Sequence, residues 1–330
     1  YSGLALLPLV VVWPWMQGER TRAIRLGAIA ALPIVALMIH DAAAYGSVHL
    51  FAMTKFQSVS NGADELIHKS IASIATFGAA AVLPIVAWGR PRRAIVGAAI
   101  GVLIGVGGAQ WAAQEGTAQM ATILSCTAGG ASIGGALSIR DPLDRWLLLW
   151  LLGGLVFLLG LRFTATRYWI PFYAPAILIG LRHAPTALAR SAAFATIVLS
   201  LMLAADDVDL ATTQAEAAQI AGSTGTGAIA GHWGFQHHLH ERGWTDIEDD
   251  QRLDPGTWVA ESRAAWPQEP ANECFDFTET IRLVDPRPGL RVHTVEGGAN
   301  FHGHTLAGKP PTKVFAPWSI GTDPMDHLTL

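Results

Sequence analysis

The stretch at 162–175, RFTATRYWIPFYAP, decides how this chain folds. It is charged and aromatic, and it lies between strongly apolar runs at 146–161 and 169–181. An arginine at the centre of a bilayer costs roughly 2.5 to 3.5 kcal/mol even on the mildest insertion scale, so the stretch is expected at a membrane interface. Three of its residues are predicted to be interfacial: Arg167, Tyr168 and Trp169.

The composition of the whole chain is that of an integral membrane protein. Its 330 residues are 51% hydrophobic and only 15% charged, whereas about 25% of the residues in soluble domains are charged. The lipid bilayer is therefore a predicted partner. The formal net charge is -4 and no basic run of the nucleic-acid-binding type is present, so nucleic acid is not a predicted partner.

Apolar runs close to the roughly 20 residues needed to cross a bilayer predict eight transmembrane helices. They lie at 2–17, 26–45, 70–88, 94–113, 119–139, 145–162, 168–182 and 190–205. After residue 205 the chain becomes polar and rich in Asp, Glu, His and Pro. The predicted fold is an all-α polytopic membrane bundle at 1–205, followed by a small outward-facing α/β domain at 206–330.

Basic residues recur in every second predicted loop, at 18–25, 89–93, 140–145 and 182–190. Lys and Arg accumulate on the cytoplasmic side of short connections. The pattern predicts an integral protein of the plasma (inner) membrane, with its C-terminal domain on the periplasmic or extracellular side. The loop at 46–69 and the turn at 162–167 are expected on that same outer side.

Two further features of the sequence carry structural predictions. The fifth span, at 119–139, is rich in glycine and small residues, which suits close helix packing better than lipid contact. In the tail, periodicity and turn residues predict helices and strands. The helices are expected at 212–221 and 235–243, and the strands at 228–235, 257–262, 280–284 and 290–295.

Arg167 is suited to hold a phosphate at the outer interface. A guanidinium binds phosphate bidentately, and a lipid tail can lie along the flanking helices. The alternative is an anchoring role, in which Arg167 snorkels to the headgroups while Tyr168 and Trp169 join the aromatic belt. Spacing alone leaves both interpretations open.

The segment RYWIPFYAP at 167–175 is an Arg-Tyr pair followed by two prolines at the start of a late span. It resembles a signature of the polyprenyl-phosphate-sugar-dependent glycosyltransferases of the integral-membrane GT-C class, which includes protein mannosyltransferase and aminoarabinose transferase relatives. The opening YSGLALLPLVVV is similar to a segment that these enzymes carry a few spans earlier, and the tail is similar to the C-terminal periplasmic domain of several members. The resemblance covers most of 1–205.

The resemblance implies transfer of a sugar from a polyprenyl-phosphate carrier to an acceptor on the outer side of the membrane. In the family the essential acidic residues lie several spans before the Tyr-Ser-Gly-Leu segment, so they are expected upstream of Tyr1 and this chain is expected to be a C-terminal portion. The resemblance assigns Arg167 and Tyr168 as contacts to the carrier phosphate. The acceptor is left open as a lipid, a glycan or a protein, and a divalent metal ion is left open as a cofactor.

The predicted outer loop at 46–69 supplies three more candidate residues. Asp64 and Glu65 are suited to act as a general base and its partner carboxylate, because an acceptor hydroxyl must lose a proton. A solvated acidic pair without a catalytic role is the alternative. Lys69, at the start of the third span, is placed to neutralise the leaving phosphate, and snorkelling is its alternative.

The tail is rich in histidine: His232, His237, His238, His240, His302 and His304. Zinc needs three or four converging ligands, and no H-E-x-x-H or C-x-x-C motif accompanies these histidines. An exposed polar helix is the favoured interpretation, so no metal ligands are predicted, and the role of 232–240 is left open.

Two other classes of protein compete with the transferase hypothesis. One is a non-enzymatic membrane protein, either a transporter or an assembly subunit that binds a partner through its outer domain. Transporters carry ionisable residues inside their spans, and here the candidates are His40 and Asp41 near the outer end of a span. The other is an inactive, truncated remnant.

Overall fold

The computed structural model describes residues 7–48, 51, 63–80, 91–137, 141–160, 166–248, 251–265, 280–283, 291–293, 315–318, 320–322 and 324–330. These residues form two units, each with its own internal contacts. The helical unit lies within 1–111 and 122–196, and the sheet unit lies within 112–121, 197–304 and 311–330.

Nine helical segments lead from the start of the described chain to the sheet unit, and eight of them are α-helices. They are α1 (Leu7–Met16), α2 (Arg20–Tyr45), α4 (Ala63–Ala80), α5 (Pro91–Trp111), α6 (Gly116–Ala136), α7 (Pro142–Gly160), the 3₁₀ helix η3 (Thr166–Trp169), α8 (Ile170–His183) and α9 (Thr186–Ser223). Each α-helix overlaps one of the eight predicted spans, so the positions of the helices are confirmed.

Four of these helices, α2, α5, α7 and α9, are long and apolar enough to cross a membrane. The surface of α2 is strongly apolar: Ile24, Leu32 and Ile39 are each more than three-fifths exposed. Exposed apolar area on this scale marks a surface that another apolar phase covers. The chain is therefore helical, with apolar helices compatible with a membrane and a small sheet.

Helix α9 is one continuous helix of 38 residues. It contains no Pro, and its only Gly is Gly222 in the last turn, so nothing in its sequence interrupts the helix at residue 205. The predicted helix at 212–221 is therefore the last part of α9 and not a separate element. At 1.5 Å per residue α9 is about 57 Å long, nearly twice the roughly 30 Å hydrocarbon core of a bilayer.

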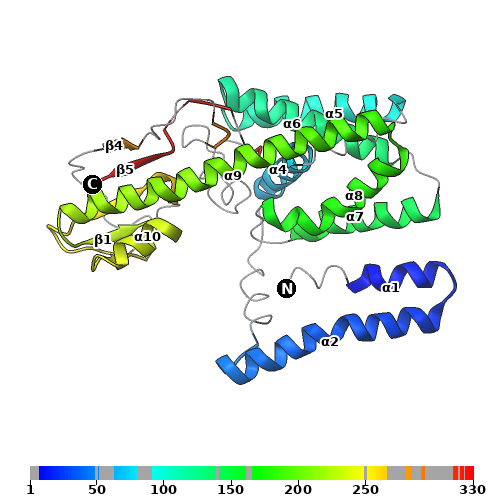
Figure 1. The fold of residues 1–330 in the computed structure, drawn as a ribbon, viewed down its shortest axis with the longest axis horizontal. Coiled ribbons are helices and arrows are strands. Elements are labelled where there is room, and N and C mark those ends of the chain that lie inside the picture. Colours follow the sequence, from blue (N-terminus) through cyan, green and yellow to red (C-terminus); the bar gives the residue numbers. More distant parts are fainter. Residues whose placement is uncertain are drawn as a thin grey trace. The chain divides into compact units, whose positions relative to one another are not determined.

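Helices α5 and α6 pack backbone against backbone (Figure 1). A Cβ atom added at Gly101 of α5 would lie 2.2 Å from the carbonyl oxygen of Cys126, and one at Gly97 would lie 2.1 Å from that of Gly130. Gly129, on another face of α6, is equally close to α4, where its added Cβ would lie 2.3 Å from the Ile74 carbonyl oxygen. The predicted close packing of the fifth span is confirmed.

The tail forms a five-stranded sheet with the order β2-β1-β3-β5-β4. Its strands are β1 (Ala228–Ala230), β2 (Thr245–Asp246), β3 (Val259–Ser262), β4 (Thr280–Leu283) and β5 (Asp326–Thr329). Strands β2, β1 and β3 are parallel, whereas β5 is antiparallel to both β3 and β4. Within the described residues of 290–295, the predicted strand is reduced to a single bridge between Arg291 and Gly321.

The core of the sheet unit joins the end of α9 to the sheet through α10 (Trp233–His240). Buried alanines near the end of α9 allow the other core residues to pack closely against that helix. Helix α10 contributes Phe235 and Leu239, both fully buried. The strands complete the core with Ile229, Ala260 and Leu328. The predicted α/β character of the tail and its helix around 235–243 are confirmed, although that helix ends at His240.

Asp326 is a fully buried carboxylate at the start of β5. Its Oδ2 atom accepts a hydrogen bond from Ser262 Oγ at 2.5 Å, and Oδ1 accepts from the Ala264 and His327 amides at 2.8 and 2.7 Å. Burial raises the pKa of Asp326 from 3.8 to about 6, although these hydrogen bonds act in the opposite direction. Desolvation of the charged form is therefore the larger effect.

We expect Asp326 to make the sheet unit less stable as the pH rises. Because its pKa is higher in the folded state than in the unfolded state, the folded state binds more protons between about pH 4 and pH 6. The contribution is fully present below about pH 4 and is lost as the pH passes 6, by up to about 3 kcal/mol. Asp326→Asn should remove this loss. Hydrogen exchange of the β5 amides at pH 4.5 and 7, corrected for intrinsic rates, measures it.

The variant is also the control for other groups, because carboxylates elsewhere titrate equally in both proteins. Only the difference between wild type and Asp326→Asn is assigned to Asp326. An identical change in β5 protection between the two pH values in both proteins would contradict the assignment.

Candidate functional site

Asp64 and Glu65 belong to the first turn of α4 and not to a loop. The predicted outer loop at 46–69 was therefore too long, because α4 begins at Ala63. Acidic residues are favoured in a first helical turn, where they face the positive end of the helix dipole. Their side chains lie outside the described residues, so their role as general base and partner carboxylate stays a prediction.

Lys69 is buried, with 1% of its surface exposed. Helix α4 begins six residues earlier, so Lys69 lies inside a helix and not at its first residue. Its burial contradicts the snorkelling alternative, since a snorkelling ammonium reaches water. A fully buried lysine inside a helical membrane unit is costly, and such residues typically mark a functional site.

The face of α4 that carries Lys69 also carries hydroxyl groups and an aromatic ring. Ser73 follows Lys69 by four residues, and Thr76 and Phe77 follow one turn later, so the positions share one side of the helix. All are buried. The centroid of the Phe77 ring lies 5.7 Å from that of Trp169 and 6.0 Å from that of Tyr173. The rings of Phe77 and Tyr173 are stacked. This face of α4 therefore packs on η3 and the start of α8.

Helix η3 holds the predicted phosphate-binding pair. The backbone of Arg167 lies in η3, and its side chain is outside the described part of the chain. Tyr168 is half-buried against the aromatic cluster of Phe77, Trp169 and Phe172. Arg167 and Tyr168 thus directly precede the residue on which the Lys69 face of α4 packs.

Trp169 is 2% exposed, which corrects its predicted place in a lipid-facing aromatic belt. Its indole N–H is buried and has no hydrogen-bond acceptor among the described residues. The hydroxyl of Thr76 is also buried and unpartnered there. Two unsatisfied polar atoms thus lie at the junction of α4 with η3, and buried polar atoms without partners are rare.

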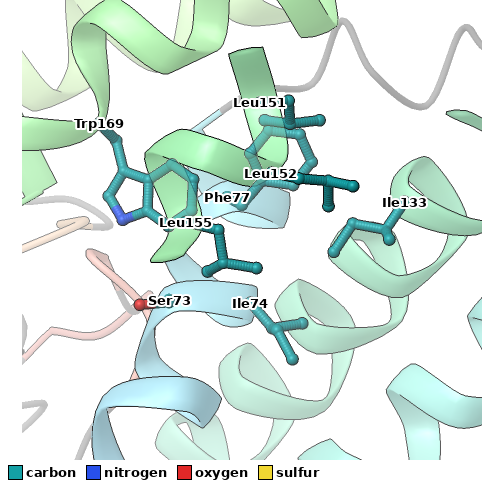
Figure 2. Close-up of a pocket in the computed structure, with 8 residues that line it drawn as sticks. All are labelled: Ser73, Ile74, Phe77, Ile133, Leu151, Leu152, Leu155 and Trp169. Atoms are coloured by element: carbon teal, nitrogen blue, oxygen red, sulfur yellow. The ribbon is translucent and has the colours of Figure 1, made fainter. Parts of the chain in front are cut away.

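A small cavity adjoins this junction (Figure 2). Ser73, Ile74 and Phe77 line it from α4, Ile133 from α6, three leucines from α7, and Trp169 from η3. Its volume is about 10 Å³, which is room for about one water molecule. Apart from Ser73, the side chains that line the cavity are apolar or aromatic. The cavity is too small to hold a sugar.

A cluster of charged residues that the sequence analysis did not identify joins the start of α7 to the end of α8. The Asp144 side chain is 1% exposed, and its Oδ2 atom lies 2.5 Å from His183 Nε2. Arg182 Nε lies 2.8 Å from Asp144 Oδ1 and forms an ion pair with it. The N–H bond does not point at this oxygen well enough to form a hydrogen bond. The sequence contains a signal for this cluster, because an acidic residue lies in the predicted basic loop at 140–145 and Arg182 and His183 lie in the next basic loop.

In the sheet unit, Asp206 of α9 holds the segment at 291–293. Its Oδ2 atom accepts hydrogen bonds from the Val292 and His293 amides at 2.6 and 2.9 Å. The neighbouring Asp207 has an oxygen 3.4 Å from His293 Nδ1. These aspartates stand where the sequence changes from apolar to polar, and only the tertiary structure shows what they bind.

The histidines in the described part of the tail do not all converge on one point. His240 Nε2 bonds to Asp246 Oδ1 at 2.7 Å, and His232 immediately precedes α10. His237 and His238 lie together with Glu241, which the sequence analysis did not include. His302 and His304 are outside the described residues.

We compared the chain with models of protein families, with curated proteins and with solved structures. None of them matches. A function for this chain must therefore be inferred from the geometry and chemistry of the site.

Proposed function

We propose that this chain is a membrane glycosyltransferase, or the part of one that binds the lipid carrier. In this proposal it transfers a sugar from a polyprenyl-phosphate carrier to an acceptor on the outer side of the plasma membrane. All eight apolar helices cross the bilayer, and the sheet unit is periplasmic or extracellular. The acceptor is a hydroxyl-bearing lipid, glycan or protein.

One observation carries the proposal: the α4 face with buried Lys69 packs, through Phe77 and Trp169, on the segment that carries Arg167 and Tyr168. Two cationic residues from distant parts of the sequence are thus placed on adjoining elements. Lys69 precedes Phe77 by eight residues, or about 12 Å along α4 towards its N-terminal end. In the proposed orientation that end is the outer one, so Lys69 approaches the level of lipid phosphates.

The chemistry follows from these roles. The acceptor hydroxyl oxygen attacks the anomeric carbon of the sugar, and the bond from that carbon to the phosphate oxygen breaks. Asp64, Glu65 or a carboxylate of another segment takes the hydroxyl proton. Lys69 and Arg167 neutralise the polyprenyl phosphate as it leaves, and the unpartnered indole N–H of Trp169 is a further donor for an oxygen of the carrier.

We expect Lys69→Met to weaken binding of undecaprenyl phosphate about tenfold to hundredfold, because charge-assisted hydrogen bonds contribute about 1.5–3 kcal/mol. Methionine keeps an unbranched apolar stem and removes the charge. Arg167→Ala should act in the same direction. Native mass spectrometry of the detergent-purified chain, or quenching of tryptophan fluorescence, measures the affinity.

Two controls make the test specific. Undecaprenol, which lacks the phosphate, should bind weakly to wild type and equally to all variants. Arg22→Met removes an exposed arginine that pairs with Glu19, so it should leave the affinity unchanged. Equal affinities of wild type and Lys69→Met, or equal binding of the alcohol and the phosphate, would rule out this site and favour a binding subunit or a transporter.

A further inference from the structure

The C-terminal end of α10 brings together two imidazoles and one carboxylate. His237 Nε2 lies 3.7 Å from Glu241 Oε1, and His238 Nδ1 lies 3.6 Å from Glu241 Oε2. The donor atoms of all three side chains lie within 4.8 Å of one another. Each carboxylate oxygen thus faces a different imidazole nitrogen.

This arrangement follows from helical spacing. Glu241 follows His237 by four residues and His238 by three, and both spacings place side chains next to each other on a helix surface. The two imidazole rings are neighbours as well, with centroids 5.4 Å apart. The C-terminal end of a helix also carries a partial negative charge, which favours a bound cation.

The geometry points to a Zn²⁺ site formed by His237, His238 and Glu241, with water as the remaining ligand. Zinc bonds of about 2.0–2.1 Å place tetrahedral donors about 3.4 Å apart. The distances of 3.7 and 3.6 Å run to different oxygens of Glu241, and one ligand atom from each of the three residues lies within 4.8 Å of the others. The side chains of His237 and Glu241 are exposed, so rotation about their side-chain bonds can bring the three ligand atoms to a common ion. The site lies outside the helical unit and does not depend on the lipid-phosphate proposal.

Neighbouring residues define the boundary of the site. His240 is not among the three residues whose ligand atoms come together, and its Nε2 atom bonds to Asp246 Oδ1. Arg242, the cation closest in sequence, donates from NH1 to the His238 carbonyl oxygen at 2.6 Å. Its side chain also lies against Gly222, where an added Cβ would be 2.5 Å from Arg242 Cδ. The Arg242 guanidinium is therefore bound to the backbone carbonyl of His238.

The test uses the full chain in detergent, purified without a polyhistidine tag, because such a tag binds the same metals. Titration with Zn²⁺ by calorimetry should show one ion per chain, and Co²⁺ should give the visible absorption of a tetrahedral complex. Loss of even an outer-shell partner weakens metal sites about tenfold to hundredfold. His237→Gln, His238→Gln and Glu241→Gln should each weaken binding by at least that much.

His240→Gln is the matched control, since it removes an exposed histidine from the same helix and should leave the affinity unchanged. Circular dichroism of each variant verifies that α10 and the rest of the chain stay folded. Binding that survives Glu241→Gln, binding that His240→Gln weakens equally, or the absence of binding to the wild type would overturn the assignment.

Discussion

Replacing Gly101 by alanine is expected to force α5 and α6 apart. The new Cβ atom would lie 2.2 Å from the Cys126 carbonyl oxygen and 2.9 Å from Thr127 Cα. Both are backbone atoms, so no side-chain rotation relieves the contact. Overpacking of this kind costs about 1–3 kcal/mol in protein cores, and we expect the upper end here. The unfolding midpoint in detergent measures the effect.

Gly107 provides a matched control on the same helix. It is exposed, and an added Cβ there would meet no atom within 4 Å. Because alanine is a better helix former than glycine by about 1 kcal/mol, Gly107→Ala should be neutral or stabilising. Equal effects of the two substitutions would show that the backbone contact between α5 and α6 does not limit stability.

Removal of Arg182 is expected to destabilise the pairing of α7 with α8 by about 1–3 kcal/mol, because the buried Asp144 carboxylate would lose one of its two partners. The Asp144 side chain is 1% exposed while that of Arg182 is 39% exposed, so the carboxylate would be left with His183 alone, whose Nε2 atom lies 2.5 Å away. Arg182→Met keeps much of the apolar stem and isolates the effect of the charge. Chemical unfolding in detergent measures the loss.

The asymmetry of burial gives this prediction a second test. Adding Asp144→Asn to Arg182→Met removes the stranded carboxylate, so the double variant should be more stable than Arg182→Met alone. Asp141→Asn is the control, because Asp141 is exposed, lies 3.5 Å from Arg182 and can still cap α7 as an amide. A double variant that is no more stable than Arg182→Met would contradict the role assigned to the buried charge.

The positions of the eight helices could be predicted because each depends on a local property, the length of an apolar run. The glycine contacts of α6 were predictable for the same reason, since a small-residue stripe has few other uses in a membrane helix. The length of α9 could not be predicted in this way, because the apolar run ends at residue 205 while the helix continues to Ser223. Ala, Gln and Glu in that region are good helix formers in water.

The environment of single polar residues was predicted less well. Lys69, Trp169 and Asp144 are buried because distant segments cover them, and sequence spacing contains little information about such contacts. The aromatic-belt alternative for Trp169 requires a side chain that faces lipid, and its burial against Phe77 could not be predicted from spacing. Arg167, Asp64 and Glu65 remain predictions from the sequence.

The glycine-lined faces of α6 have a consequence for how the chain is made. Helix α6 is not among the helices apolar enough to cross a membrane by composition, and glycines fit it against both α4 and α5. During synthesis it follows those two helices out of the ribosome. In the proposed eight-span topology, insertion of α6 into the membrane should therefore require contact with α4 and α5, so that insertion and assembly take place together. A variant such as Gly101→Ala would then be inserted less efficiently, in addition to being less stable once folded.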